Sequence, residues 1–193
     1  IKKIITSDVK EFTSYLSLRP LSASKESLET MQEIFANREK LFSVNRFFIK
    51  KKIEQENRYL SFDSTEFNLE PDLKESPGSL RDFQTAGWIL DHCFKLKSHA
   101  DITNSNIFNS DEFKRIINAH DFIKLLRYSI NLIQTNSRNR LSFNSQIELA
   151  KKANIKETKV KQPVERLMQL YYSNAEKLSI FNETIFDLSL IHI

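Results

Sequence analysis

The chain contains little that breaks or crosslinks a polypeptide. Its 193 residues include two glycines, four prolines and a single cysteine, Cys93. So few turn-forming residues favour long helices over many short strands. One cysteine excludes an internal disulfide, and a lone thiol fits the reducing cytoplasm, where we expect the protein to work. No apolar run has the length that a membrane-spanning helix needs, so we expect no membrane partner.

The first residues lack two further signals. Ile1 stands where a complete protein begins with Met, and no apolar segment of a secretory signal follows Lys2 and Lys3. We therefore expect the chain to be a piece of a longer protein. The net charge of +4 permits an acidic partner but does not specify one.

Apolar residues recur at helical spacing along most of the chain. This pattern predicts an all-α helical bundle of about seven helices with one ordered Pro/Gly loop, in a single domain of residues 1–193. The predicted helices cover residues 8–18, 24–36, 39–59, 80–96, 110–134, a short stretch from 145, and 163–190. The helix at 110–134 is apolar on most of its surface, which predicts a central position. Gly87 in the fourth helix costs about 1 kcal/mol relative to Ala, which predicts a close approach of another helix at that point.

The densest turn signals lie just before the fourth helix. Pro71 and Pro77 each push the preceding residue out of the α region, and Gly78 permits a positive φ. Ser79 and Asp82 have the spacing of a capping box for the helix that follows, and Ser145 and Glu148 have the same spacing at the sixth helix. Loops that are fixed and charged in this way often hold something.

The residues in and around this loop carry a resemblance. The motif LEPDLKESPG at 69–78, followed by Leu80-Arg81-Asp82, resembles the signature of the bacterial protein-PII uridylyltransferase/uridylyl-removing enzymes. Supporting blocks of the same family follow the same order in this chain: KIEQENRY at 52–59, LLRYSINL at 125–132, NRLSFNSQ at 139–146 and PVERLM at 163–168. We call residues 68–82 the signature loop.

The resemblance implies a place within a larger enzyme. In the family, a helical region like this one follows a nucleotidyltransferase head and precedes a phosphohydrolase domain. Residues 1–60 would then be helices trailing the head, and residues 61–193 the signature loop and bundle. The parent enzyme would transfer uridylyl from UTP to a tyrosine of the signalling protein PII, with magnesium, and reverse the transfer hydrolytically in answer to glutamine. This is nitrogen signalling.

The chain lacks the residues of nucleotidyl transfer itself. That chemistry needs clustered carboxylates for the metal beside a Gly-Ser phosphate turn, and no such cluster is present. We therefore predict no catalytic residue, no metal ligand and no activity for this chain alone. The pair His120-Asp121 resembles half of a metal phosphohydrolase site. His92, His99 and His192 do not supply the missing ligands at a suitable spacing, so a structural histidine is the better interpretation.

The signature loop is the candidate site, and the sequence leaves two roles open for it. Its polar and turn residues are Glu70, Asp72, Lys74, Ser76, Gly78, Arg81 and Asp82. In one role, Lys74 and Arg81 meet a phosphate or a partner carboxylate beside the transferase site. In the other, Glu70, Asp72 and Asp82 neutralise those two cations and fix the loop internally.

Other interpretations concern binding rather than catalysis. Arg127, Arg138, Arg140 and the lysines from 151 to 161 form a basic surface for a neighbouring domain or an acidic protein, or a solvated face. Aromatic residues do not interleave with them, which argues against nucleic acid. A helical interaction module without nucleotide would expose an apolar patch, which we would expect on the 163–190 helix. A relative of the glutamine synthetase adenylyltransferases is a third interpretation, which the LEPDLK motif disfavours.

Overall fold

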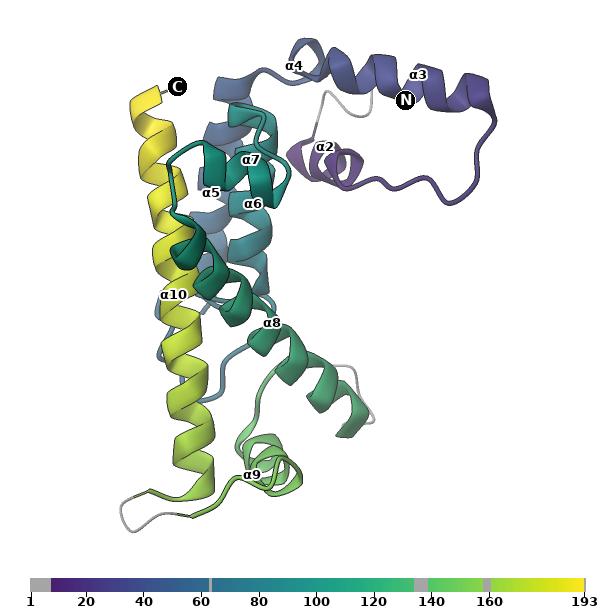
Figure 1. The fold of residues 1–193 in the computed structure, drawn as a ribbon. Coiled ribbons are helices and arrows are strands. Elements are labelled where there is room, and N and C mark those ends of the chain that lie inside the picture. Colours follow the sequence, from purple (N-terminus) through teal and green to yellow (C-terminus); the bar gives the residue numbers. More distant parts are fainter. Residues whose placement is uncertain (1–7, 63, 134–138, 158–160, 193) are drawn as a thin grey trace.

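The computed structural model describes residues 8–62, 64–133, 139–157 and 161–192, and regular structure in these ranges is helical apart from one isolated bridge (Figure 1). The helices are α2 (Val9–Leu16), α3 (Lys25–Ala36), α4 (Arg38–Leu41), α5 (Val44–Leu60), α6 (Leu80–Phe94), α7 (His99–Asn104), α8 (Ser110–Ile133), α9 (Phe143–Lys152) and α10 (Pro163–His192). The all-α prediction is confirmed.

The described ranges contain nine helices rather than about seven, because one predicted helix is divided in two and one predicted connection contains a helix. The predicted helix at 39–59 is interrupted at Phe42, whose extended backbone turns the ring into the core, where it is 1% exposed. There it packs 5.1 Å from the ring of Phe12 and edge-on to Phe47. The segment between α6 and α8, predicted as a polar connection, contains α7, which is closed by a capping box of Ser98 and Asp101.

The central helix is α10, not the one at 110–134. Figure 1 shows α10 running the length of the molecule, and it packs against α6, α8 and α9. Its buried stripe includes Tyr171, Ala175, Leu178 and Ile185. Helix α8 crosses α10 at an angle and diverges from it toward α9, so that Leu125 and Leu132 stay exposed. The apolar residues on most sides of the 110–134 helix therefore did not identify the central helix of the bundle.

The buried face of α6 does not include Gly87, where a close helix approach was predicted. Its interior residues include Thr85, Ala86 and Ile89, whereas Phe83 is only half-buried. Gly87 is exposed, and a Cβ added there would meet nothing within 4 Å. The predicted close helix approach at Gly87 is therefore wrong. Gly78 makes the close approach instead.

Two predicted caps differ in the structure. Ser79 precedes α6, but its side chain makes no capping bond to that helix. Helix α9 begins two residues before the predicted cap at Ser145, and its N-cap is Ser142, whose hydroxyl accepts a hydrogen bond from the Ser145 N–H. The Ser79 hydroxyl donates instead to the Asp72 carbonyl of the signature loop. At α9, Ser142 and Ser145 are both residues suited to an N-cap, and spacing alone did not distinguish them.

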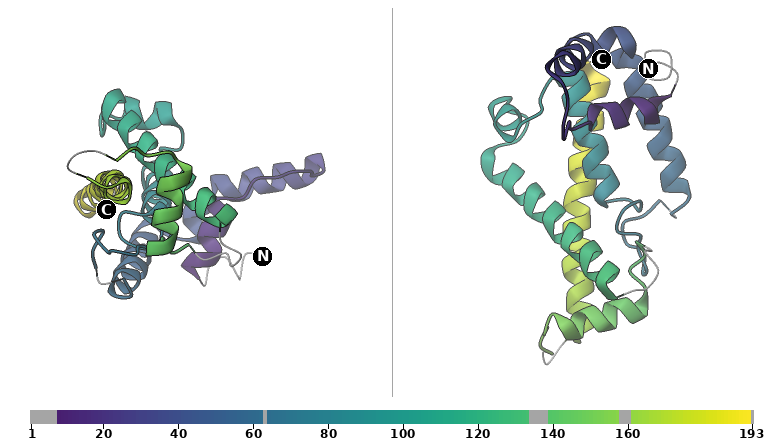
Figure 2. Two further views of the ribbon diagram at one scale, coloured as in Figure 1. Left: turned by 90° about the horizontal axis from the view of Figure 1, so that it is seen from below. Right: turned by 90° about the vertical axis from the view of Figure 1, so that its right-hand side faces the viewer.

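Helices α5 and α6 form an antiparallel pair alongside α10, and the signature loop joins them. The right-hand view of Figure 2 shows α5, α6 and α10 side by side, with α9 crossing at the far end. Helix α2 packs against both α5 and α6. Helix α3 extends away from the body and contains no fully buried residue. The loop is therefore enclosed by α5, α10 and the segment that leads into α9.

Candidate functional site

The first half of the signature loop is folded around Asp72. One carboxylate oxygen of Asp72 accepts hydrogen bonds from the backbone N–H groups of Lys74 and Glu75, both at 2.8 Å. The Ser76 hydroxyl accepts from the Asp72 N–H at 2.9 Å. The Ser79 hydroxyl donates to the Asp72 carbonyl oxygen at 2.9 Å. The motif thus satisfies its own backbone groups, as buried turns must.

Gly78 fixes the loop against the central helix. Its φ is +71°, and a Cβ placed on it would lie 2.5 Å from the carbonyl oxygen of Ala175. Ala175 is itself fully buried on α10. Only glycine combines this backbone conformation with such a short approach. The second turn of the motif is therefore a contact point between the loop and α10.

Asp82 fixes the loop to α5 and α10 from the buried side. Its side chain is fully buried and accepts hydrogen bonds from the Arg58 guanidinium, from the Tyr59 hydroxyl at 2.7 Å and from the Gly78 N–H at 2.7 Å. Burial raises the pKa of the Asp82 carboxyl, and these three donors act in the opposite direction. Burial and then the charge of Asp82 raise the pKa of Tyr59, so the phenol keeps the proton that it donates. The Asn182 amide of α10 completes the anchor by donating to the Asp82 carbonyl at 3.0 Å.

The two cations of the loop converge on Glu75. Arg81 makes a two-pronged contact with its carboxylate, at 3.2 Å through Nε and 2.9 Å through a terminal nitrogen, and Lys74 lies 3.2 Å away. Burial alone would raise the pKa of Glu75, but hydrogen bonds and charge from Arg81 and Lys74 outweigh it and lower that pKa. The side chains of Lys74 and Arg81 remain 34% and 24% exposed. Glu75 itself is 27% exposed, so the two cations reach the surface together with the carboxylate that orients them.

Glu70 ties the loop to the segment before α9. Its carboxylate pairs with Arg140 at 2.7 Å and accepts from the Phe143 N–H at 2.8 Å. The backbones of Asp72 and Arg140 form an antiparallel bridge beside this contact. The Gln146 amide donates to the carbonyls of Leu69 and Leu141, at 2.7 and 3.0 Å. Residues about 70 positions apart are therefore held together by main-chain and side-chain contacts.

All seven predicted site residues lie in this one assembly, but their partners differ from the predicted ones. An internal ion-pair role assigned Glu70, Asp72 and Asp82 to Lys74 and Arg81. In the structure these acids meet Arg140, backbone N–H groups and Arg58, while Glu75 holds both cations. Sequence reasoning missed Glu75, Arg58 and Asn182 as site residues. Arg58 and Glu75 lie within the sequence blocks that resemble the family, and this position was the signal that could have identified them as site residues.

The His120-Asp121 pair lies apart from the signature loop, whereas Arg140 of the predicted basic surface pairs with Glu70 in the loop. His120 is 3.0 Å from Asp121 and stacks on Phe83, with ring centroids 4.2 Å apart. Within the described ranges no group of three or more His, Cys, Asp and Glu side chains is placed to hold a metal. Of the basic surface, Arg127 donates to Asn139 at 2.7 Å, and Arg138 lies outside the described residues. In the part of the chain that the structure covers, the helices are too short or too polar to span a membrane.

The geometry defines a class: an all-α domain built round a buried Pro/Gly loop whose surface carries Lys74 and Arg81 paired with Glu75. Comparison with known proteins agrees with the sequence motif. The family model of the GlnD PII-uridylyltransferase matches residues 46–186, from α5 to near the end of α10. The chain therefore belongs to this family.

Curated relatives match over nearly the whole chain. The bifunctional uridylyltransferase/uridylyl-removing enzyme of Nitrosococcus oceani is 31% identical over 181 residues, which is 94% of this chain and 20% of that protein. Those of Azotobacter vinelandii and Aromatoleum aromaticum are 29% and 32% identical and cover 93% and 91% of the chain. The chain spans about a fifth of the length of these relatives. No solved structure matches it.

Proposed function

We propose that this chain is the helical module of a bifunctional uridylyltransferase/uridylyl-removing enzyme that acts in nitrogen signalling. The parent enzyme uses magnesium and UTP to modify a PII-type protein in the cytoplasm, and adjacent nucleotidyltransferase and phosphohydrolase domains carry the chemistry. The observation that supports this most is the family match over residues 46–186, because it includes the whole signature loop. The three relatives from Nitrosococcus, Azotobacter and Aromatoleum carry the uridylyltransferase name, which favours this proposal over a glutamine synthetase adenylyltransferase.

The module supports the transferase site by presenting Lys74 and Arg81 from a rigid base. Asp82 and Gly78 fix the loop to α5 and α10, and Glu75 orients both cations while leaving them partly exposed. A positioned guanidinium is a good clamp for phosphate oxygens because it donates two parallel hydrogen bonds. The preorganised pair would complete one wall of the site built by the preceding domain.

The test uses the natural enzyme that contains this segment. Arg81→Ala and Lys74→Ala should each lower kcat/KM for UTP-dependent labelling of a PII-type protein by about tenfold or more, the usual scale for a charged hydrogen bond to a transferring phosphate. Lys114→Ala on α8 is the matched control, because Lys114 is an exposed lysine away from the loop. Unchanged transfer and stability in both loop variants would refute the role.

A specific observation favours docking of the acceptor protein at the same end of the module. A hollow of about 600 Å³ adjoins the loop and is lined by apolar side chains, among them Leu69, Phe143, Val164 and Met168. Leu69 and Phe143 are more than half exposed. Apolar hollows of this kind are suited to protein contacts. Leu69→Ser should raise the KM for the PII-type protein and leave the KM for UTP unchanged; an equal effect on both would contradict docking there.

The same hollow supports the alternative of a helical interaction module that uses no nucleotide. Its apolar lining comes partly from α10, the helix on which such a patch was expected. The transfer assay separates the two proposals. An interaction module would tolerate Arg81→Ala in transfer yet lose its protein partner when Leu69 is replaced.

A further inference from the structure

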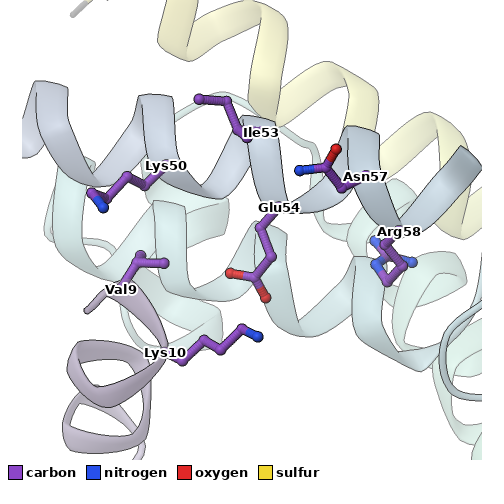
Figure 3. A pocket seen from close by; sticks show the side chains of 7 residues that line it. All are labelled: Val9, Lys10, Lys50, Ile53, Glu54, Asn57 and Arg58. Atoms are coloured by element: carbon purple, nitrogen blue, oxygen red, sulfur yellow. The ribbon is translucent and has the colours of Figure 1, made fainter.

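Two hollows lie side by side beneath α2. One, of about 560 Å³, is lined by Val9, Lys10, Lys50, Ile53, Glu54, Asn57 and Arg58 (Figure 3). The other, of about 580 Å³, lies toward α6 and the signature loop, where Glu75, Arg81 and Trp88 contribute to its wall. Lys10 and Glu54 line both hollows. Together they form one cleft, the α2 cleft, which runs from the middle of α5 to the loop.

Positive charge exceeds negative charge along this cleft. Its cations and their immediate neighbours are Lys10, Lys50, Lys51, Arg58, Lys74 and Arg81, and the carboxylates beside them are Glu54, Glu75 and Asp82. Each carboxylate already has a cationic partner: Lys51 for Glu54, Arg81 for Glu75 and Arg58 for Asp82. The excess charge therefore stays available to an incoming anion.

Two ammonium groups in the cleft, those of Lys10 and Lys50, are distinct from these pairs. Among the described residues, no carboxylate lies within ion-pair distance of either one. Figure 3 shows Lys10 reaching from α2 beneath Glu54, and Lys50 projecting from α5 toward Val9. The exposed amide of Asn57 lines the same hollow. Donors from two different helices thus line one hollow, at opposite sides of it (Figure 3).

Lys51 adds a desolvated charge to the floor of the cleft. Its side chain is 2% exposed, pairs with Glu54 at 3.0 Å and lies 4.6 Å from the ring centre of Trp88. Burial lowers the pKa of this ammonium, and the neighbouring Arg81 and Arg58 act in the same direction. A buried cation in a cluster of cations is stabilised when a further anion approaches.

We infer that the α2 cleft binds a polyphosphate chain, with Lys10 and Lys50 as direct ligands and Arg81 at the end nearest the signature loop. An elongated anion fits better than a single carboxylate because the donors are spread over two joined hollows. Phosphate oxygens are also well matched to lysine and arginine donors. The inference rests on the proposed function only for its natural ligand, the triphosphate of a nucleotide.

The experiment is a calorimetric titration of the chain with inorganic tripolyphosphate at low salt, alongside its fluorescence. Trp88 is the sole tryptophan and lines the cleft, so its emission reports on this site. We expect saturable binding, a change in Trp88 emission and a higher unfolding midpoint, because a ligand of the folded state stabilises it by mass action. UTP should displace the tripolyphosphate, whereas uridine should not.

The variants separate a site from general charge attraction. Lys10→Ala combined with Lys50→Ala should weaken binding about tenfold or more. Lys114→Ala combined with Lys124→Ala removes the same charge from exposed positions on α8 and should weaken it less than about twofold. Neither pair has a carboxylate partner in the described structure, so both variants should fold.

Several results would overturn the inference. These are the absence of saturable binding, equal weakening in the two double variants, and displacement by uridine. The tripolyphosphate carries no uridine and needs no acceptor protein. Its failure to bind would therefore count against the α2 cleft alone, and the role of Arg81 in transfer would still be decided by the separate transfer assay.

Discussion

Gly78 in the signature loop lies directly on the backbone of Ala175 in the central helix. A Cβ on Gly78 would come within 2.5 Å of the Ala175 carbonyl oxygen, which leaves no room for a side chain, and the φ of +71° disfavours one as well. This contact sets how deeply the loop sits against α10. The family motif at 69–78 therefore has a structural requirement independent of any ligand.

Gly78→Ala is predicted to destabilise the chain by about 2–4 kcal/mol, because strain at positive φ adds to a clash with backbone that cannot rotate away. Gly87→Ala is the matched control. Gly87 lies in mid-helix with open space around its Cβ position, so the substitution should stabilise by about 0.5–1 kcal/mol. Urea unfolding of both variants checks the pair. Equal effects would show that the contact with Ala175 is not as described.

Arg58 and Asp82 form the buried ion pair beneath the loop. Arg58→Met leaves a fully buried carboxylate without its cation, which is predicted to cost about 3–5 kcal/mol. The same substitution at Arg140, whose side chain is 63% exposed in its pair with Glu70, should cost less than about 1 kcal/mol. Denaturant unfolding measures both. A smaller loss at Arg58 than at Arg140 would argue against Asp82 as the anchor.

His92 is predicted to make stability depend on pH. It is fully buried, its Nε2 lies 2.9 Å from the Phe42 carbonyl, and burial lowers its pKa to about 4 from an ordinary value of 6.5. The neutral ring then donates through Nε2. The folded pKa is depressed, so the unfolded chain takes up the proton first. The stabilisation is complete above about pH 6.5 and is lost progressively as the pH falls toward 4, by up to about 3 kcal/mol.

Thermal unfolding between about pH 4 and 7.5 tests this linkage against His92→Gln, which keeps an N–H donor without the titration. The variant should show a flatter pH profile than the parent chain over this window. His99→Gln is the control, and its profile should follow that of the parent. Parallel profiles for the parent and His92→Gln would exclude His92 as the source of the pH dependence.

Ser142 is predicted to stabilise α9 as its N-cap. Its hydroxyl accepts from the Ser145 N–H at 3.4 Å and lies 2.9 Å from the Ser145 hydroxyl. Ser142→Ala should cost about 1 kcal/mol, the usual value for a lost N-cap. Ser24→Ala, at the N-cap of the exposed α3, provides a comparison within the same chain. A loss at Ser142 below about 0.3 kcal/mol in chemical unfolding would contradict the cap.

Local sequence was sufficient for the helical class and for the position of the loop. Helical spacing, sparse glycine and the turns at Pro71 and Pro77 depend on interactions within a few residues, and these are written directly in the chain. The motif at 69–78 in addition indicated the family to which the chain belongs. Interruptions of the helices were harder to predict. The helix is interrupted at Phe42, whose ring packs in the core against Phe12, a residue 30 positions earlier in the chain.

Only the tertiary structure decided the partners. Asp82 meets Arg58 across 24 residues, Asn182 reaches Asp82 across 100, and Arg140 reaches Glu70 across 70. No local spacing rule encodes such pairs, because they depend on which helices become neighbours. The same holds for the central place of α10 and for the close approach at Gly78 rather than Gly87. The sequence by itself determined the elements and the loop that joins α5 to α6. The contacts were determined by packing, because apolar area is buried between elements that become neighbours and not within a single element.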